Sequence, residues 1–452
     1  MSERENFKSR LGFLLVSAGC AIGIGNVWKF PWLVGQYGGG IFVLFYLIFL
    51  VIMGVPVLSM EIGIGRGSRQ STVNGFKALE KKGTKWHFEG YLSIVGCYLL
   101  LMFYNSVAGW MIDYTYKFAT GVFSSPSVDV NSVFNSMLSS PLESAIFLFV
   151  VVAIAVIVCA KGLENGVEKV NKVMMIGLLC LIIVLVIHSF TLPGAKSGLS
   201  FYLVPSFENI EEKGLINTLV AAMNQAFFTL SLGICAMEIF GTYMSKDNTL
   251  LSESVRICAL DTFVAFASGL IIFPACFSYG VTPDAGPSLI FMTLPRVFMN
   301  MPLGSLWGTL FFVFMSFAAL STVIAVMENI VASFMDTWHL SRTKSVIINA
   351  IALSILSLPV AFENNLLKGV TVIGSRAFLD SWDFIVSNLL LPIGSLIVCL
   401  FCTQKSGWGF DGYITEANTG IGIKLKKNKA MKIYLSYILP LFVVLIIVLG
   451  LI

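Results

Sequence analysis

Apolar residues occur along the chain in long blocks that short polar stretches separate. The blocks approach or exceed the roughly 20 residues that cross a bilayer as an α-helix. They do not show the sustained alternation of apolar and polar positions that is typical of a membrane β-barrel. The pattern predicts an all-α integral membrane protein with eleven transmembrane helices. The predicted spans are 11–36, 40–65, 88–117, 142–160, 166–188, 214–243, 251–281, 304–336, 344–362, 376–403 and 431–452.

The first predicted span contains residues that disfavour a continuous helix. It includes the stretch "SAGCAIGIGNVWKFPW", in which Gly19, Gly23 and Gly25 are followed directly by Asn26. Gly19 and Gly23 form a GxxxG pair, so close packing against another helix is one explanation. The adjacent amide favours a second explanation, an unwound segment whose freed backbone groups line a cavity.

The sixth predicted span has an interruption of the same kind. It reads "NQAFFTLSLGICAMEIF" and is broken by Thr229, Ser231 and Gly233. Interruptions at corresponding positions of two five-helix halves indicate an inverted-repeat transporter with a site at the membrane midplane. The predicted units are a first five-helix repeat at 1–190, a second at 191–403 with an extracellular cap loop at 282–303, and a cytoplasmic loop with the last helix at 404–452.

Two further spans carry polar side chains at membrane depth. Asp261 lies in the seventh span without a basic residue beside it, and such a carboxylate usually faces a partner, an ion or a pathway. The eighth span contains Ser321 and Thr322, whose hydroxyls can alternatively bond to the preceding helical turn. Carbonyls, hydroxyls, an amide and a carboxylate together suit a hard monovalent cation.

Composition supports a membrane location. Hydrophobic residues make up 57% of the chain and charged residues 12%, whereas soluble domains carry about a quarter charged residues. With the N-terminus placed in the cytoplasm, most lysines and arginines fall in cytoplasmic loops, which predicts an extracellular or periplasmic C-terminus. The beginning of the chain has no convincing small-residue cleavage site, so we expect the first span to be retained in the plasma membrane.

The remaining composition gives little sign of enzyme chemistry. The three histidines and nine cysteines lack the spacing of a metal site. Cys399 and Cys402 lie in an apolar run, where we interpret them as small buried hydrophobic residues. We expect the lipid bilayer and a small-molecule substrate as partners, and neither a nucleic acid nor an organic cofactor.

Four stretches of the chain resemble the neurotransmitter:sodium symporter family, in its bacterial amino-acid branch. They are "RLGFLLVSAGCAIGIGNVWKFPW", "GVPVLSMEIGIGR", "NQAFFTLSLGICAMEIFGTY" and "FAALSTVIAVMENIVASFMD". The resemblance follows the spans in order over nearly the whole chain. It implies the leucine-transporter-type fold in its eleven-helix form, and sodium-coupled symport by alternating access rather than an enzymatic activity.

The resemblance also implies two co-transported sodium ions. The first sodium site consists of Ala21, Asn26, Thr229 and Asp261, and the carboxylate of the substrate completes it. The second consists of Gly19, Ile22, Ala318, Ser321 and Thr322. In both sets, residues that lack a polar side chain contribute their carbonyl oxygens.

The substrate site that the resemblance implies has apolar walls. Gly23 stands where monoamine-transporting members carry Asp, which leaves space for a carboxylate and favours an amino acid. We therefore expect a neutral hydrophobic L-amino acid, and both aromatic and branched aliphatic side chains remain open. The implied substrate-binding residues are Ala21, Gly23, Ile24, Gly25, Leu100, Tyr104, Phe228, Thr229, Ser231, Ile234, Thr322 and Val326.

Two positions bear on whether transport depends on chloride. Asp261 stands where many relatives have Asn, and Ala265 stands where chloride-dependent animal members have Ser. A fixed carboxylate beside the sodium ion, with the chloride-binding hydroxyl missing, predicts transport that is independent of chloride.

The gates carry one substitution. The outer Arg–Asp pair of the family corresponds here to Lys29 and Asp383, so a point charge replaces the bidentate guanidinium. The inner latch corresponds to Arg4 and Asp336, with Phe7 beside it. A role for Arg4 in setting the topology is the alternative interpretation.

Two other classes are less compatible with the pattern. A channel requires a continuous polar pore, whereas the polar residues gather at one depth between the two gates. An enzyme within the membrane requires a paired nucleophile and base or a metal, and Asp261 has no such partner in sequence. A sensing homologue that does not transport remains open.

Overall fold

The structure is a computed structural model that describes residues 7, 9–125, 128–210, 213–280 and 289–451. Two sequence predictions fall partly outside these ranges. They are the Arg4 half of the inner latch and the first part of the predicted cap loop, residues 282–288.

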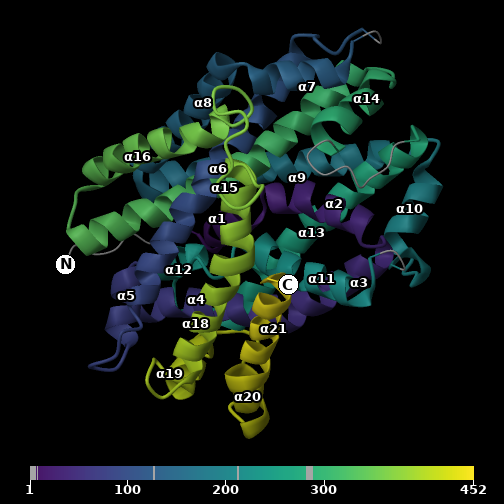
Figure 1. Cartoon of the computed structure of the whole chain (residues 1–452). Helices are drawn as coiled ribbons and strands as arrows, with labels where there is room; N and C mark the ends of the chain where they lie inside the picture. Colours follow the sequence, from purple (N-terminus) through teal and green to yellow (C-terminus); the bar gives the residue numbers. More distant parts are fainter. Residues whose placement is uncertain (1–6, 8, 126–127, 211–212, 281–288, 452) are drawn as a thin grey trace.

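The described part of the chain is a bundle of long helices with shorter helices at its edges (Figure 1). The long segments are α1 (Arg10–Ala21) with η1 (Gly25–Lys29) and α2 (Phe30–Gln36); α3 (Gly40–Phe49) with η2 (Leu50–Gly54) and α4 (Val55–Ser68); α6 (Phe88–Ala119); α8 (Pro141–Ala160); η3 (Leu163–Glu168) with α9 (Lys169–Ser189); α11 (Leu215–Thr229) and α12 (Ala236–Thr242); α13 (Leu250–Ser278); α15 (Gly304–Trp338); α16 (Arg342–Phe362); α17 (Phe378–Phe384) with η6 (Ile385–Leu390) and α18 (Leu391–Thr403); and α20 (Lys429–Ile433) with η7 (Tyr434–Ile438) and α21 (Leu439–Leu451). The shorter elements are α5 (Thr72–Leu79), α7 (Val130–Ser139), α10 (Ala195–Leu203), η4 (Glu208–Ile210), η5 (Leu289–Thr293), α14 (Leu294–Met299) and α19 (Phe410–Ala417).

The number of membrane-crossing helices depends on how broken segments are counted. Over the described residues, 9 helices are long and apolar enough to cross a bilayer, and 10 if the bent pair α1 and η1–α2 is one span. The predicted span 214–243 is present as α11 and α12, which are each shorter than a bilayer requires. The chain is therefore a multi-pass membrane protein.

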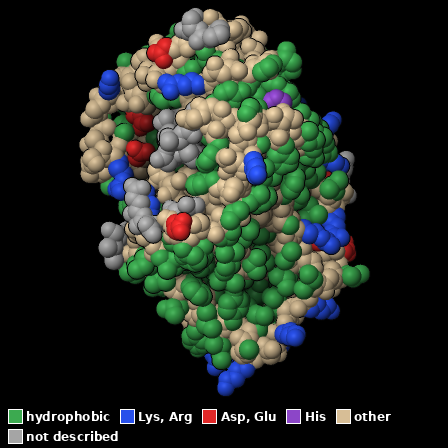
Figure 2. All heavy atoms as spheres, turned by 90° about the vertical axis from the view of Figure 1, so that its right-hand side faces the viewer, with side chains coloured by type: hydrophobic (Ala, Val, Ile, Leu, Met, Phe, Trp, Pro, Cys, Tyr) green, Lys and Arg blue, Asp and Glu red, His purple; other side chains and the backbone are tan. Residues whose placement is uncertain are grey.

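The long helices form an inner group and an outer group. In the most apolar stretches of α6 and α15, 78% and 83% of the residues are buried, against 33% in the last helical segment. The outer helices accordingly present apolar side chains outward, as a lipid-facing surface requires. Figure 2 shows hydrophobic side chains over a broad area of one face, with most of the basic side chains toward its edges.

The described part of the predicted cap folds back onto the bundle. Phe291, Leu294 and Phe298 in η5 and α14 are buried. Tyr114 of α6 donates a hydrogen bond to the carbonyl of Phe291 at 3.0 Å, and the Phe291 ring stacks on Phe134 of α7. Burial of these side chains explains why so apolar a segment can connect two membrane helices.

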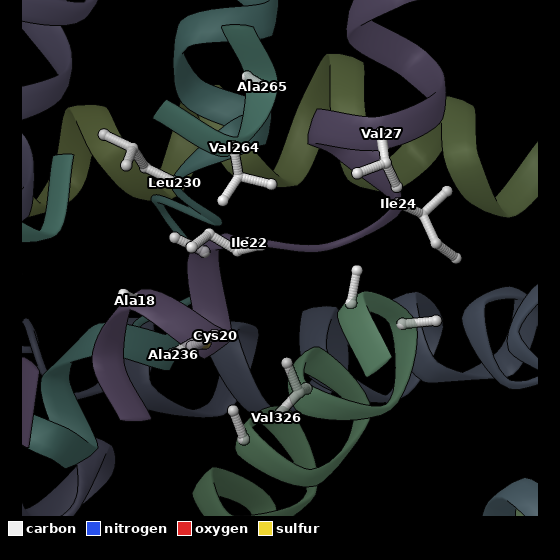
Figure 3. Close-up of a cluster of buried hydrophobic side chains, with 14 of the residues drawn as sticks. Ala18, Cys20, Ile22, Ile24, Val27, Leu230, Ala236, Val264, Ala265 and Val326 are labelled. Atoms are coloured by element: carbon white, nitrogen blue, oxygen red, sulfur yellow. The ribbon is translucent and has the colours of Figure 1, made fainter. Parts of the chain in front are cut away.

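The first span is broken between α1 and η1. The backbone of Ile22 is extended, with φ −70° and ψ 104°, and the two helical parts are bent by 55°. Figure 3 shows the chain crossing this break between Ile22 and Ile24, with Leu230 and Val264 on one side and Val326 on the other.

The sixth span is broken between α11 and α12. Ser231 and Cys235 adopt positive φ angles of 51° and 50°, which are uncommon for residues with a side chain, and Gly233 has φ 92°. Glu61 of α4 accepts a hydrogen bond from the Gly233 N–H at 2.5 Å. A buried carboxylate thus satisfies a backbone donor that the break leaves without a helical partner.

Candidate functional site

Three side chains from different helices meet beside the two breaks. Asn26 of η1 donates from Nδ2 to the Asp261 carboxylate at 2.7 Å and to Thr229 Oγ1 at 3.1 Å. Thr229, at the end of α11, donates to the second carboxylate oxygen at 3.0 Å. Asn26 Oδ1 accepts the N–H of Gly23 at 3.0 Å. These are the three side chains that the sequence assigned to the first sodium site.

Within the described residues, the carboxylate of Asp261 has only neutral hydrogen-bond partners. Its side chain is fully buried in α13, and among the described residues no lysine, arginine or histidine forms an ion pair with it. An isolated buried charge costs several kcal/mol, so this arrangement favours a cation as the balancing charge.

A second group of oxygens lies where α1 ends against α15. Ser321 Oγ is 2.9 Å from the carbonyl oxygen of Ala318 and 3.3 Å from that of Ile22. Thr322 Oγ1 is 3.3 Å from the same Ile22 oxygen and 3.4 Å from that of Gly19. All five residues of the predicted second sodium site are thus neighbours. Their hydroxyls reach across to α1 in addition to their own helix.

Between these groups lies a small cavity. Its volume accessible to the centre of a water molecule is about 10 Å³, room for about one water. The hydroxyl of Tyr104 lies at the α1 break, where Tyr104 Oη accepts the Ile24 N–H at 2.7 Å. The lining residues are Ala21, Gly25, Leu100, Tyr104, Phe228, Ser231, Ile234, Thr322, Val386 and Leu391.

Not every predicted substrate residue lines this cavity. Gly23 has no space for a side chain, because a Cβ there would overlap the Tyr104 hydroxyl and crowd Thr322 Oγ1. Ile24 and Val326 are buried beside the break but are not among the lining residues. Thr229 instead belongs to the Asp261 group.

The outer pair closes over the cavity. Lys29 Nζ lies 3.2 Å from an Asp383 carboxylate oxygen and 3.8 Å from the centroid of the Phe228 ring. The cation thus contacts both its predicted partner and the aromatic residue that roofs the cavity, a favourable cation–π arrangement.

The inner side is also packed. The Phe7 ring contacts Phe13 at 5.6 Å and Tyr243 at 6.0 Å between centroids. Asp336 accepts the backbone N–H of Ser71 at 2.8 Å. Because Arg4 lies outside the described residues, its pairing with Asp336 stays a prediction.

Sequence reasoning missed several residues of the site. Ser387 donates to Asp383 at 2.7 Å and accepts from Lys29 at 3.1 Å, and its i+4 spacing from Asp383 was a readable signal. Gln225 donates to the carbonyl of Gly25 at 3.0 Å. Val386 and Leu391 are apolar residues in an apolar span, so nothing in the sequence distinguishes them from lipid-facing neighbours.

These features define a class of protein. Two broken helices, a buried carboxylate and two groups of oxygens around a small cavity are typical of a membrane transporter that couples a solute to a cation.

Comparisons with known proteins agree with this class. The sodium:neurotransmitter symporter family profile matches residues 4–136 and 134–452. The chain is 35% identical over 408 residues to the uncharacterized sodium-dependent transporter YhdH of Bacillus subtilis, covering 90% of this chain and 89% of that protein. It is 27% identical to the sodium- and chloride-dependent GABA transporter 2 of Rattus norvegicus, covering 74% of this chain and 62% of that protein. The crystal structure of MhsT in complex with L-phenylalanine matches with a TM-score of 0.90 at 33% identity, and the match covers 100% of both chains.

The chain belongs to the sodium:neurotransmitter symporter family. It is therefore a sodium-coupled membrane transporter and not an enzyme, as the sequence predicts.

Proposed function

We propose that this protein imports a neutral hydrophobic L-amino acid together with two sodium ions, independently of chloride. The observation that carries the proposal is the full burial of Asp261 among neutral hydrogen-bond partners. A sodium ion held by Asp261, Asn26, Thr229 and the carbonyl of Ala21 balances that charge. The substrate carboxylate completes this first site and couples the ion to the solute.

Sodium binding at this site requires a change in the Asn26 amide. The Nδ2 group now faces the Asp261 carboxylate, and a cation needs the Oδ1 lone pairs instead. Turning the amide moves Oδ1 away from the Gly23 N–H that it accepts. That N–H then becomes available to the carboxylate of the substrate, so the ion and the substrate support each other's binding.

The second sodium ion is assigned to the oxygens between α1 and α15. Its ligands are the carbonyls of Gly19, Ile22 and Ala318 and the hydroxyls of Ser321 and Thr322. Support comes from the hydroxyl oxygens, which lie within 3.5 Å of these carbonyls. An ion here joins the broken helix to α15 and holds the inner half of the first span in place.

We assign the substrate to the small cavity, which must widen from its volume of about one water molecule to admit an amino acid. Its carboxylate faces the N–H groups of Gly23 to Gly25 and the hydroxyl of Tyr104, and its ammonium faces the carbonyl of Ser231. Apolar walls from Leu100 and Ile234 select a hydrophobic side chain, and Val386 and Leu391 extend them. The MhsT complex contains L-phenylalanine, so an aromatic amino acid is the first candidate and a branched aliphatic one the second.

The proposal also includes the topology of the chain and the two gates. Eleven spans form two inverted five-helix repeats, 1–190 and 191–403, followed by 404–452, with the N-terminus cytoplasmic and the C-terminus outside. The Lys29–Asp383 pair and Phe228 close the outer path, and the Arg4–Asp336 latch closes the inner one. Ala265 lacks the hydroxyl that chloride-dependent members use, and Asp261 supplies the negative charge.

Two ions provide enough driving force for concentrative uptake. Each charge that crosses 100 mV contributes roughly 2.3 kcal/mol. Two sodium ions with a neutral amino acid therefore support a concentration ratio of roughly three orders of magnitude from the potential alone.

The test is uptake into proteoliposomes with an imposed sodium gradient. We expect saturable uptake of L-phenylalanine that requires sodium, increases with an inside-negative potential and is unchanged when gluconate replaces chloride. Competition by a panel of unlabelled amino acids ranks aromatic against branched substrates. Uptake that ignores the sodium gradient would contradict the coupling, and uptake that collapses in gluconate would contradict chloride independence alone.

A further inference from the structure

A second, much larger cavity lies away from the candidate transport site. It has a volume of about 810 Å³ and lies between the α3–η2–α4 segment, α13 and the α20–η7 segment. Its walls are almost entirely apolar. Val51 and Phe263 at its rim are 65% and 45% exposed, so the cavity opens to the lipid-facing surface of the bundle.

The polar groups in the walls are already satisfied within the protein. Tyr434 donates its hydroxyl hydrogen bond to the carbonyl of Ile52. Tyr413 donates to Ser59 Oγ at 2.9 Å. The space that remains offers apolar contacts rather than hydrogen bonds, and it therefore fits a hydrocarbon chain better than a polar solute.

The length of the cavity corresponds to one leaflet. Along α13 its lining runs from Leu251 to Phe266, which is roughly 22 Å at 1.5 Å per residue. Half of a bilayer with its interfacial region measures about 20–22 Å. The Leu251 end lies near the beginning of α13, on the side that we propose to be cytoplasmic.

A basic segment adjoins the same end of the cavity. Leu425 and Met431 line the cavity, and the sequence between and around them is "KLKKNKAMK". Lys424, Lys426 and Lys429 are exposed, and among the described residues they form no ion pair. Figure 2 shows basic side chains at the lower end of the molecule, where α20 lies in Figure 1.

Two further lysines of the segment are already engaged. Lys427 pairs with Asp411 at 2.7 Å, and Lys432 Nζ lies 5.9 Å from the centroid of the Phe410 ring. The three remaining lysines are therefore the ones available to a ligand. An apolar cavity with unpaired positive charge at one end is complementary to an anionic amphiphile.

We propose that this cavity binds an anionic glycerophospholipid of the cytoplasmic leaflet. One acyl chain fills the space between α4, α13 and η7, and the phosphate headgroup contacts Lys424, Lys426 and Lys429. The lipid connects the last helix to α13 on the lipid-facing side of that helix. Thr262, next to Asp261, lines the cavity, so the lipid supports the helix that carries the candidate sodium ligand.

The experiment is native mass spectrometry of the full-length protein in detergent with added phosphatidylglycerol or phosphatidylcholine. We expect one phosphatidylglycerol to be retained with a preference of roughly ten-fold or more, since each lysine near an anionic group contributes roughly a five-fold factor before screening. Changing Lys424, Lys426 and Lys429 together to Gln should remove the preference. The matched control changes Lys81, Lys82 and Lys85, exposed lysines of another loop, and should leave it intact.

Filling the cavity tests the acyl-chain part separately. Ala259 lines the cavity from an exposed position of α13, and Ala259→Trp should lower retention of both lipids. Val255→Trp, at a second exposed lining position, serves if the first variant does not fold. Equal retention of the two lipids by the unmodified protein, an equal loss in the control lysine variant, or full retention in a folded tryptophan variant would each overturn the proposal. None of these outcomes depends on sodium-coupled transport.

Discussion

Asn26 donates a 2.7 Å hydrogen bond to the carboxylate of Asp261, across 235 positions of sequence. The bond joins the break in the first span to the helix α13. Thr229 bonds to the other carboxylate oxygen from the end of α11. Three helices therefore meet at one buried negative charge. Binding or release of a cation there changes the contacts of both broken spans.

The first prediction concerns that charge. Asp261→Asn keeps the shape of the side chain and removes the charge, so we expect the sodium concentration for half-maximal binding to rise at least ten-fold. Scintillation-proximity binding of L-phenylalanine at varied sodium measures it. Asp411→Asn removes an exposed carboxylate on α19 and should leave the sodium dependence unchanged. Normal sodium affinity in Asp261→Asn would show that the negative charge of Asp261 does not contribute to ion binding.

The second prediction concerns the hydroxyls of α15. Thr322→Val preserves volume and removes an oxygen that reaches three carbonyls at the end of α1, those of Gly19, Cys20 and Ile22. Loss of one ligand should weaken sodium binding several-fold and reduce its cooperativity, measured as the slope of binding against sodium concentration. Ser268→Ala is the matched control, because within the described part of the chain its buried hydroxyl bonds only to Val264 one turn earlier. An equal effect of the two variants would indicate a general cost of removing a buried hydroxyl.

Much of the fold is readable from the sequence because the bilayer constrains it. Apolar blocks of sufficient length mark the helices, and the interruptions near Gly23 and Ser231 fall where the structure has extended or left-handed backbone. The polar residues Asn26, Thr229 and Asp261 stand out for the same reason, since hydrocarbon penalises every unsatisfied polar group.

Other parts of the site have no such signal. Val386 and Leu391 line the cavity, but an apolar residue in an apolar span looks the same whether it faces lipid, a neighbouring helix or a substrate. Glu61 is visible as a buried charge, yet only the structure shows that it holds the Gly233 N–H. Partners separated by more than 100 positions become neighbours through helix packing, which periodicity does not encode.

The third prediction concerns the outer gate. Asp383→Asn should speed release of bound substrate to the outside by a few fold, because partly exposed ion pairs contribute about 0–1 kcal/mol. The Lys29 and Asp383 side chains are 21% and 34% exposed. Dissociation of radiolabelled substrate after dilution measures the effect. Ser387→Ala, which leaves both charges in place, should change it less, and a larger effect there would assign the closing role to the hydroxyl.

The fourth prediction concerns the break in the sixth span. Gly233 has φ 92°, and a Cβ at this position would collide with the backbone oxygen of Leu391. Gly233→Ala should therefore lower the melting temperature in detergent and abolish substrate binding. Gly177→Ala is the control, because the nearest atom to its Cβ belongs to the Phe317 side chain at 3.1 Å, which can move. Similar melting temperatures for the two variants would contradict the backbone argument.

The last prediction concerns pH and Glu363, which follows α16 and accepts the N–H of Leu379 at 2.8 Å. Burial raises the pKa of the Glu363 carboxyl to about 7 from its ordinary value of 4.5, and the nearby Asp380 adds to the rise. The folded protein therefore keeps this proton where the unfolded chain has lost it. The resulting stabilisation is complete below about pH 4.5 and is lost as the pH rises through about 7.

We therefore expect the melting temperature of Glu363→Gln, relative to the unmodified protein, to increase between pH 5 and pH 8, as followed by dye fluorescence in detergent. Asp411→Asn provides the opposite control. Its hydrogen bond with Lys427 lowers the pKa of the Asp411 carboxyl, so any contribution from this group is lost only below about pH 4 and leaves the pH 5–8 range unaffected. A constant difference between Glu363→Gln and the unmodified protein across that range would mean that Glu363 is already ionised at pH 5. The carboxylate would then act as a charged cap of α17, and protonation at acidic pH would weaken the contact with the helix that carries Asp383.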